Sequence, residues 1–373
     1  MRLVVSGGGT GGHIYPGLAV IEVLKEMVPG SRILYVGTAE GMEADIVPKQ
    51  GIEFARVRSG GIRGKSLVKA MAGAVRAALG VKDAFGILRD FRPDVVLGTG
   101  GYVSGPVILA AWTQRIPCAI QEQNSVPGKT NLILAGFVQR IFCAWEKTRT
   151  SFRGSSKVMV TGNPVRKAVI EAKRDDGYRR FGLDPGKTTV LLLGGSRGAM
   201  TLAEAGLKIA ERADDLGFQM LFITGNPYFD MVAEKLGCRP QEGIKNAKVG
   251  NVIVQAYVYD IEYALACADL AVCRAGGMTL AEVTARGIPA VVVPSPNVAG
   301  NHQEYNARAL EELGACEVVT EARGAGAVAE ACLDLLVDRA KMARMAEASK
   351  AAGRPHAAET IVRELIKLAR TRR

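Results

Sequence analysis

One local pattern recurs in both halves of this 373-residue chain: an apolar run enters a glycine-rich turn, and a helix-like segment follows. The first half contains VVSGGGTGGH and VLGTGGYVSGP, and the second half contains LLLGGSRGAM and AVCRAGGMTLAE. Apolar runs alternate with segments of helical spacing between these turns, which predicts parallel sheets with helices on both faces. The duplication therefore predicts an α/β chain of two Rossmann-like domains that face a cleft.

The apolar runs define the expected strands. They fall at residues 2–6, 32–37, 94–99, 117–122, 140–145 and 157–162, and then at 189–195, 219–225, 252–257, 270–275, 289–294 and 316–320. Asn163-Pro164 is a turn signal, so we expect domains at residues 1–163 and 164–354. A last helix at about 355–373 follows a Gly-Arg-Pro break, and we expect it to cross back to the first domain.

Composition narrows the class of protein. Hydrophobic residues make up 48% of the chain and charged residues 23%, which is typical of a globular protein. No run of about 18 uncharged apolar residues occurs, and the amino terminus does not resemble a signal peptide. Seven cysteines without a C-x-x-C pair favour reduced thiols in the cytoplasm and argue against a zinc site.

The net charge is +11, and much of it lies in residues 56–92, which contain nine Arg or Lys residues and two acidic residues. Leu67, Met71, Val75 and Leu79 form an apolar stripe in the same segment. Such a helix either lies on an anionic membrane surface or packs on its own sheet with a solvated basic edge. A nucleic-acid partner is disfavoured, because no cluster of stacking aromatic residues accompanies the charge.

The first turn contains Gly7, Gly9 and Gly12 in the G-x-G-x-x-G pattern. A strand–glycine–helix turn directs backbone N–H groups and a helix dipole at one point, which favours phosphate. A dinucleotide site would need an acid at the end of the next strand, and ILYVGT has none. His13 follows the last glycine, where the helix dipole keeps an imidazole neutral. It is either a general base or an orienting group for phosphate.

Seven motifs occur in one order along nearly the whole chain: GGGTGGHIYPGLAV, GTGGYVSGP, QEQNSVPG, TGNPVR, GGSRGA, CRAGGMTLAE and NHQEYNA. Together they closely resemble the MurG family of peptidoglycan glycosyltransferases. The resemblance implies a GT-B fold and transfer of N-acetylglucosamine from UDP-N-acetylglucosamine to lipid I, which is undecaprenyl-pyrophosphoryl-N-acetylmuramyl-pentapeptide. The product is lipid II. It also implies a peripheral enzyme on the cytoplasmic face of the bacterial inner membrane, in cell wall biogenesis, with no cofactor and no metal.

The resemblance assigns site residues one by one. The donor-binding residues that it implies are Thr10, Gly11, Gly12, Asn124, Arg166, Ser196, Val258, Gly277, Met278, Thr279, Leu280, Ala281, Glu282 and Gln303. His13 is the candidate catalytic base because of its position after the glycine loop. The uracil contact falls on Val258 or its neighbour Ile261. The two glycine loops of the first half are expected to hold the acceptor diphosphate through Gly9, Gly100, Gly101, Tyr102 and Ser104.

The chain departs from the family pattern at two donor-side positions. Arg197 stands where Gln is common, and Gly276-Gly277-Met278 replaces a version that contains Ala. The expected reaction is one inverting displacement, in which the acceptor C4 hydroxyl attacks the anomeric carbon. His13 takes the proton, while Arg166 and the helix start at Ser196 stabilise the leaving UDP. The rival interpretations are a glycolipid synthase of the same fold, a sugar-nucleotide epimerase, and a basic nucleic-acid-binding protein.

Overall fold

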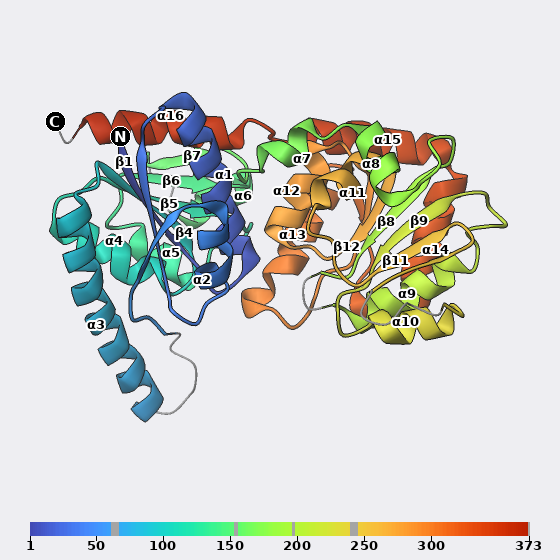
Figure 1. The fold of residues 1–373 in the computed structure, drawn as a ribbon, viewed down its shortest axis with the longest axis horizontal. Helices are drawn as coiled ribbons and strands as arrows, with labels where there is room; N and C mark the ends of the chain where they lie inside the picture. The colour runs from blue at the N-terminus through green and yellow to red at the C-terminus, as the bar shows by residue number, and fades with distance from the viewer. Residues whose placement is uncertain (61–66, 153–155, 196–197, 239–244, 372–373) are drawn as a thin grey trace. The chain divides into compact units, whose positions relative to one another are not determined.

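A computed structural model describes residues 1–60, 67–152, 156–195, 198–238 and 245–371. The chain divides into two compact units (Figure 1). Unit 1 comprises Met1–Lys167 and Arg354–Arg373, and unit 2 comprises Ala168–Gly353. Each unit is α/β with its own sheet, as the alternation of apolar runs and helical segments predicts.

Unit 1 is built on a seven-stranded sheet in the order β3-β2-β1-β4-β5-β6-β7, and all neighbouring strands are parallel. Its strands are β1 (Arg2–Gly7), β2 (Arg32–Gly37), β3 (Glu53–Arg56), β4 (Val95–Gly100), β5 (Cys118–Glu122), β6 (Arg140–Cys143) and β7 (Val158–Val160). The expected strands of this half are all present. The sequence analysis missed β3, because EFAR is short and alternates polar with apolar residues.

Helices cover both faces of the unit 1 sheet. Leu3 and Val5 of β1 pack towards α1 and α16, while Val4 between them packs towards α3, α4 and α5, as the alternation of side chains along a strand requires. The helices of unit 1 are α1 (Gly11–Met27), α2 (Glu43–Ile46), α3 (Leu67–Phe91), α4 (Ser104–Thr113), α5 (Lys129–Leu134), α6 (Glu146–Ser151) and α16 (Ala357–Arg370), with the 3₁₀ turn η1 (Pro48–Gln50).

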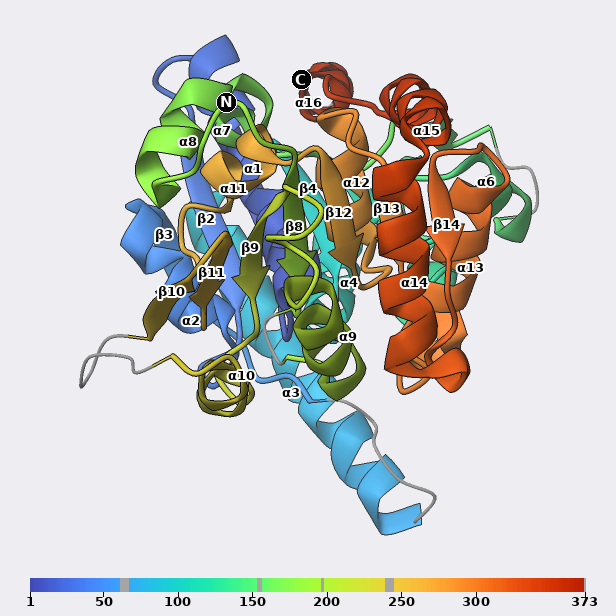
Figure 2. The same cartoon turned by 90° about the vertical axis from the view of Figure 1, so that its right-hand side faces the viewer.

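Unit 2 has a second seven-stranded sheet, in the order β10-β11-β9-β8-β12-β13-β14 (Figure 2). Its neighbouring strands are parallel except β10 and β11, which form an antiparallel pair at one edge. The strands are β8 (Thr189–Leu193), β9 (Gln219–Ile223), β10 (Asn246–Val249), β11 (Val252–Gln255), β12 (Leu270–Cys273), β13 (Ala290–Val292) and β14 (Cys316–Val318). Here the sequence analysis missed only the largely exposed β10.

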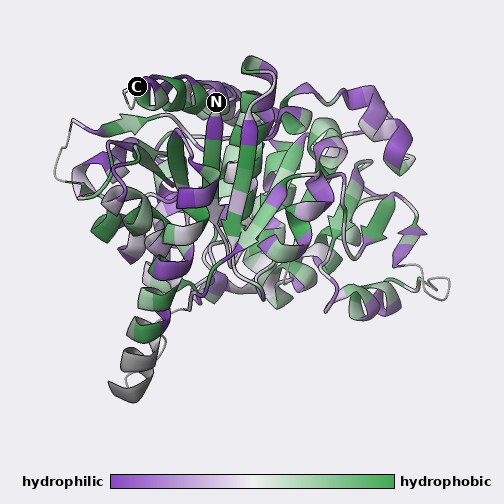
Figure 3. Ribbon diagram, turned by 60° about the vertical axis from the view of Figure 1, so that its left-hand side comes forward, coloured by the Kyte–Doolittle hydropathy of each residue, from purple (hydrophilic) through white to green (hydrophobic). Residues whose placement is uncertain are grey.

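The helices of unit 2 pack on its sheet and on one another. Helices α9, α10 and α14 share one apolar core with the sheet, and in Figure 3 the strands are mostly hydrophobic while the helices carry both kinds of residue. The helices are α8 (Arg174–Phe181), α9 (Met200–Ala210), α10 (Phe229–Lys235), α11 (Ile261–Cys267), α12 (Gly277–Ala285), α13 (His302–Glu311), α14 (Gly324–Val337) and α15 (Arg339–Ala352). Helix α7 (Lys167–Glu171) begins where unit 1 ends, and η2 (Ala299–Asn301) and η3 (Glu321–Arg323) are 3₁₀ turns.

Helix α16 belongs to unit 1 although it lies at the other end of the chain. Ile361, Val362 and Leu365 are fully buried in the core that α1 shares with the sheet. Arg140 at the start of β6 forms an ion pair with Glu364 of α16, with an Nε–Oε2 distance of 3.3 Å. The chain passes from unit 1 to unit 2 after Lys167, a few residues beyond the expected boundary, and returns at Arg354.

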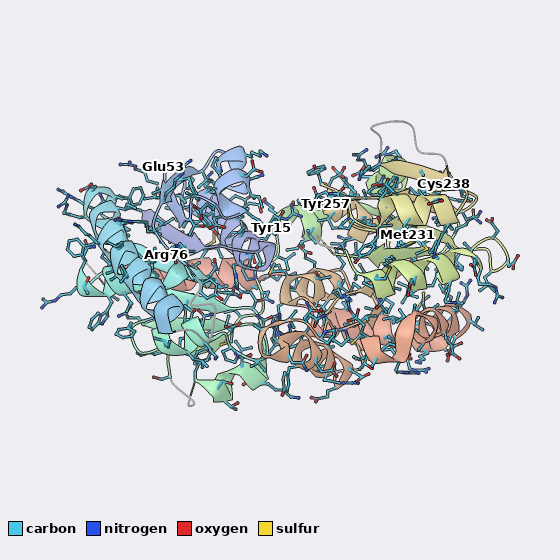
Figure 4. All side chains as sticks on the ribbon, turned by 90° about the horizontal axis from the view of Figure 1, so that it is seen from below. Tyr15, Glu53, Arg76, Met231, Cys238 and Tyr257 are labelled. Carbon is cyan, nitrogen blue, oxygen red and sulfur yellow. The ribbon has the colours of Figure 1, made fainter. Side chains whose placement is uncertain are left out.

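Helix α3 carries most of the basic segment 56–92. Its C-terminal half packs on the sheet through Ala84, Leu88 and Phe91. Nearer its start, the side chain of Val75 is 59% exposed, and Arg76 projects from the same part of the helix (Figure 4). The expected apolar stripe is therefore not buried along its whole length. The side chains of Leu67 and Met71 lie outside the described residues. None of the described helices is both long enough and apolar enough to span a bilayer.

Candidate functional site

In both units the candidate residues follow the carboxyl ends of parallel strands. In unit 1 they come after β1, β4, β5 and β7, and in unit 2 after β8, β11, β12 and β13. Strands that run parallel end at the same edge of a sheet, and this edge is where open α/β sheets bind ligands. Each unit therefore gathers its candidate residues at one edge.

The two glycine loops of unit 1 interlock. The Gly8 N–H donates to the Gly100 carbonyl over 3.3 Å. Gly101 has a φ of +80°, and a Cβ there would collide with the Gly8 carbonyl oxygen. Gly100 has a φ of +108°, and a Cβ on it would lie 2.6 Å from Cδ2 of His13. Both positions need glycine for conformation and for space, so the loop after β4 forms the wall behind the His13 ring.

The His13 side chain is held by backbone groups. Its Nδ1 lies 3.0 Å from the Gly8 carbonyl oxygen and 3.4 Å from Oγ1 of Thr10. A carbonyl can only accept, so Nδ1 carries the proton in the neutral ring and Nε2 carries the lone pair. The hydroxyl of Thr99 donates to the His13 carbonyl over 2.6 Å. His13 is half-buried in the first turn of α1, where the helix dipole favours the neutral ring.

A buried carboxylate stands behind this loop. Oε2 of Glu43 accepts the Gly9 N–H at 2.9 Å, while Oε1 accepts the backbone N–H and the hydroxyl of Thr38 at 3.0 and 2.7 Å. Burial alone would raise the pKa of the Glu43 carboxyl, but these hydrogen bonds outweigh it and hold that pKa below its ordinary value. Sequence reasoning missed Glu43. The available signal was a carboxylate shortly after the carboxyl end of the second strand.

Two residues expected to hold the acceptor diphosphate are engaged inside unit 1. The Gly9 N–H donates to Glu43 and is not available to a ligand in this conformation. Ser104 is fully buried, and its hydroxyl contacts the carbonyl oxygens of Ser6 and Gly100, at 2.8 Å each. Ser104 therefore shapes the loop after β4 from within. Tyr102 in the same loop is exposed, so it remains accessible to a ligand.

Asn124 lies in the loop after β5, where Glu122 sets its position. Oε1 of Glu122 accepts the Asn124 backbone N–H at 2.9 Å and its side-chain N–H at 3.3 Å. Oε2 of Glu122 accepts from Gly128 and Asn131, which fixes the other end of the loop. Thr148 donates to the Asn124 carbonyl over 3.0 Å. The sequence analysis quoted Glu122 within QEQNSVPG but gave it no role.

Arg166 lies over the ring of Tyr15, with its guanidinium carbon 5.4 Å from the ring centroid. Tyr15 is on α1 and is labelled in Figure 4. This stacking places the expected diphosphate contact next to the helix that carries His13, Gly11 and Gly12. Unit 1 thus carries an imidazole, a half-buried amide and a guanidinium, each after a strand end of its sheet.

In unit 2 the loop after β11 contains the expected uracil contact. Val258 is buried, and its neighbours Tyr257 and Tyr259 form an edge-to-face pair with ring centroids 4.8 Å apart. Tyr257 is labelled in Figure 4, and Tyr259 is 89% exposed. Ile261, the alternative in the sequence analysis, begins α11 and is half-buried. Two aromatic rings thus lie beside the expected base contact.

Helix α12 begins at Gly277, directly after the glycine turn that follows β12. Gly277, Met278 and Leu280 are buried, so any contact they make with a ligand is through the backbone at the helix start. Thr279, Ala281 and Glu282 are half-buried.

Arg274 and Asn306 hold the turn before α12. Arg274 donates to Oε1 of Glu321 at 2.8 Å and to the Val293 carbonyl at 3.2 Å. Asn306 is fully buried and donates to the Ala275 carbonyl over 3.1 Å. Burial would raise the pKa of Glu321, but Arg274 and Thr201 outweigh it and lower that pKa. The sequence analysis gave neither Arg274 nor Asn306 a role, although both stand within its quoted motifs.

Gln303 stands in the first turn of α13, where its Oε1 accepts the Ser295 N–H at 2.9 Å. This bond ties the helix start to the loop after β13 and leaves the Gln303 amide N–H₂ as the donor for a ligand. Ser196 and Arg197, in the turn after β8, lie outside the described residues. Across the described ranges, no group of three or more His, Cys, Asp and Glu is arranged to hold a metal ion.

Comparison with known proteins decides the family. The glycosyltransferase family 28 N-terminal domain matches residues 3–143, and the corresponding C-terminal domain matches residues 189–361. A protein of Moorella thermoacetica is 42% identical over 98% of this chain and 99% of its own length. It is named UDP-N-acetylglucosamine–N-acetylmuramyl-(pentapeptide) pyrophosphoryl-undecaprenol N-acetylglucosamine transferase. This chain belongs to the MurG family.

Solved structures agree with this assignment. MurG of Acinetobacter baumannii is 25% identical, covers 98% of this chain and 99% of its own, and superposes with a TM-score of 0.74. A UDP-N-acetylglucosamine 2-epimerase from Neisseria meningitidis, solved with UDP-N-acetylglucosamine bound, has a TM-score of 0.67 at 18% identity, over 98% of this chain and 100% of its own. The second likeness shows the fold alone. This MurG-family chain is therefore a glycosyltransferase of the GT-B architecture, as the sequence motifs predicted.

Proposed function

We propose that this chain transfers N-acetylglucosamine from UDP-N-acetylglucosamine to the C4 hydroxyl of the N-acetylmuramyl group of lipid I, with inversion at the anomeric carbon. The observation that carries this proposal is the 42% identity, over nearly the full length of both chains, to a relative whose name gives this sugar donor and this lipid-linked acceptor. We assign the steps below to residues that follow the strand ends of the two units.

His13 acts as the general base. Because Nδ1–H is engaged with the Gly8 carbonyl, Nε2 is the nitrogen that accepts the proton of the C4 hydroxyl. The hydroxyl oxygen bonds to the anomeric carbon as the bond from that carbon to the UDP oxygen breaks. An α-linked donor thus gives a β-linked disaccharide, and UDP leaves with the electron pair.

Unit 2 binds the donor nucleotide. The backbone at Val258 recognises uracil beside the Tyr257 and Tyr259 rings, and the Glu282 carboxylate accepts hydrogen bonds from the ribose hydroxyls. Helix α12 directs its first-turn N–H groups at the diphosphate, and Gln303 donates to the sugar. Thr10, Gly11, Gly12 and Asn124 of unit 1 contact the transferred sugar.

Arg166 stabilises the charge that develops on the leaving UDP. Its stacking on Tyr15 restricts the guanidinium before substrate binds, so little reorganisation accompanies bond cleavage. A helix start and an arginine supply this stabilisation from the chain itself. We therefore propose a reaction that proceeds without added metal.

We further propose that unit 1 rests on the anionic cytoplasmic surface of the membrane that carries lipid I. Large apolar side chains are exposed on the three helices that cover one face of its sheet, and they are Val75, Phe85, Trp112, Leu132 and Ile133. Trp112 is 50% exposed and Ile133 is 68% exposed. The segment 56–92, which includes α3, carries nine Arg or Lys and two acids, and this charge would add attraction to anionic lipid.

A transfer assay tests the reaction. The purified chain is mixed with radiolabelled UDP-N-acetylglucosamine and a soluble lipid I analogue, without added metal. Labelled disaccharide is the expected product. Parallel reactions replace the lipid I analogue with diacylglycerol or omit the acceptor. Transfer only to diacylglycerol would indicate a glycolipid synthase, and conversion of the donor without acceptor would indicate an epimerase.

A vesicle-binding assay tests the proposed contact between unit 1 and the membrane. Arg76→Glu combined with Trp112→Ser should weaken binding to vesicles of anionic phospholipid at least tenfold, because charge and apolar area are lost together. Arg344→Glu, an equally large charge change on the exposed face of α15 in unit 2, is the matched control. Equal binding of both variants would remove the membrane proposal.

A further inference from the structure

The Gly8–Gly9 peptide group lies between two side chains that the sequence places 30 residues apart. Its carbonyl oxygen accepts Nδ1–H of His13 at 3.0 Å, and its N–H donates to Oε2 of Glu43 at 2.9 Å. A peptide group is planar, so the two hydrogen bonds leave opposite edges of one rigid unit. The orientation of the His13 ring and the position of the Glu43 carboxylate are therefore linked.

The surroundings are shaped for a carboxylate at this point. Glu43 is fully buried, and glycines at positions 8, 37 and 41 provide the space for it. A Cβ on Gly37 would lie 2.5 Å from Cγ of Glu43, and one on Gly8 or Gly41 would collide with the carboxylate itself. Three donors converge on its two oxygens, from Gly9 and from the backbone and hydroxyl of Thr38. Such a group is a fixed charge and not a solvated surface acid.

We propose that Glu43 is a positioning residue for the general base, acting on His13 through the Gly8–Gly9 peptide. Its negative charge fixes the N–H side of that peptide, which keeps the carbonyl directed at Nδ1 of His13. Hydrogen bonds in such a chain polarise one another, so the carbonyl becomes a stronger acceptor. Nδ1 keeps the proton, and Nε2 keeps the lone pair and stays directed at the acceptor hydroxyl. This inference rests on the proposed role of His13.

The loop needs this restraint because its sequence does not provide one. Gly9 has a φ of +85°, and a Cβ there would meet no atom within 4 Å, so packing at this position does not fix the Gly8–Gly9 peptide if its N–H is released. Rotation would turn the carbonyl away from Nδ1. The helix dipole of α1 would not restore the ring, because it acts on the charge of the imidazole and not on its tautomer.

Glu43→Gln tests the proposal with the least change in shape. Its single carbonyl oxygen serves either Gly9 or Thr38, and its N–H₂ group then faces a donor. We expect kcat to fall about 10- to 100-fold with the KM for UDP-N-acetylglucosamine within twofold, because the base is misdirected and the donor residues are untouched. Glu40→Gln, an exposed carboxylate in the same turn, is the matched control.

A double-mutant cycle separates positioning from general stability. If Glu43 acts through His13, Glu43→Gln added to His13→Ala should cause no more than a further twofold loss of kcat. If Glu43→Gln lowered kcat by the same factor in the wild type and in His13→Ala, Glu43 would act independently of His13, and the proposal would be overturned. Thr38→Val, which removes only one donor to Glu43, keeps the test open if Glu43→Gln does not fold, and it should lower kcat by a smaller factor.

Nitrogen NMR of the histidine ring gives a readout that does not depend on activity. The chain has three histidines, so His13→Ala assigns the His13 signals by difference. We expect neutral His13 to be protonated at Nδ1, and Glu43→Gln to shift it towards protonation at Nε2. An unchanged tautomer with normal kcat would refute the role of Glu43. Full activity in His13→Ala would instead refute the base assignment, whatever the tautomer in Glu43→Gln.

Discussion

The glycine turn after β1 in unit 1 and the glycine turn after β12 in unit 2 follow the same plan but are held by opposite charges. Glu43 stands behind the first turn and takes its Gly9 N–H. Arg274 lies within the second turn and takes its carboxylate partner, Glu321, from η3. Both turns lead into a helix, but a carboxylate supports the first turn, whereas an arginine paired with a carboxylate supports the second.

This difference teaches that the supporting side chains, more than the glycine pattern, suit each turn to its ligand. The Glu43 carboxylate at Gly9 would repel a phosphate bound to the first turn. It is compatible with a turn that orients an imidazole and sugar hydroxyls. The charge of Arg274 at the second turn is paired with Glu321, and we propose that this turn binds a diphosphate through the N–H groups at the start of α12. The following predictions test this contrast, from the largest expected effect to the smallest.

His13→Ala removes the group that the first turn orients. We expect kcat to fall by about 10²–10⁴ with little change in the affinity for UDP, because general-base catalysis is lost and donor binding is not. Steady-state kinetics with a lipid I analogue and calorimetry with UDP measure the two quantities. Small and equal effects on both would leave the first turn without a catalytic role.

Gly100→Ala inserts a methyl group 2.6 Å from Cδ2 of His13 and puts a side chain at a φ of +108°. We expect kcat to fall roughly 10²-fold through displacement of the ring, with a loss of about 1–3 kcal/mol in the free energy of unfolding. Gly86→Ala in α3, where a Cβ meets open space, is the control and should leave kcat unchanged. Wild-type kcat in Gly100→Ala would disprove the contact.

Arg274→Met removes the positive charge of the second turn and leaves Glu321 without its cation. We expect the Kd for UDP to rise roughly tenfold and the free energy of unfolding to fall by about 2 kcal/mol, since the guanidinium is largely buried. Calorimetric titration and urea unfolding measure these changes. An unaltered Kd would show that the charge of this turn is structural only.

Glu282→Ala tests the ribose contact on the helix that follows the second turn. The KM for the donor should rise about tenfold, which corresponds to the loss of one hydrogen bond to a charged group. The kcat should change less, because the ribose is remote from the breaking bond. A donor KM within twofold of the wild type would count against the assignment.

The smallest effect concerns acid stability. The pKa values of Glu43 and Glu321 lie below their ordinary range in the folded chain, so each contributes stability that is present above about pH 4.3. This contribution is lost as the pH falls through the folded-state pKa. Glu43→Gln should therefore show a smaller drop in the free energy of unfolding between pH 7 and pH 4 than the wild type. An identical drop would mean that folding does not lower the pKa of Glu43.

The sequence predicted the repeated strand–turn–helix order because that order depends on local apolar spacing. It also predicted that the candidate residues collect at strand ends, since this follows from parallel pairing alone. The strands β3 and β10 were missed because each is short and lies at a sheet edge, where alternation and exposure weaken the apolar signal.

The supporting residues could not be found in this way. Glu43 meets Gly9 across 34 positions, and Arg274 meets Glu321 across 47. No spacing rule links such pairs, because tertiary packing decides which side chain reaches which loop. The sequence therefore predicted which turns bind ligands but not which charged side chain supports each turn. It also predicted a phosphate contact at Gly9, whose N–H donates to the Glu43 carboxylate in this structure.

The return of the chain to unit 1 through α16 has a consequence for the order of folding. Ile361, Val362 and Leu365 fill the core beside α1, so residues 1–167 alone leave part of one apolar face of their sheet uncovered during synthesis. Residues 168–353 are complete as a unit before α16 leaves the ribosome. The second unit is thus able to mature first, and the unit that carries His13 is finished last.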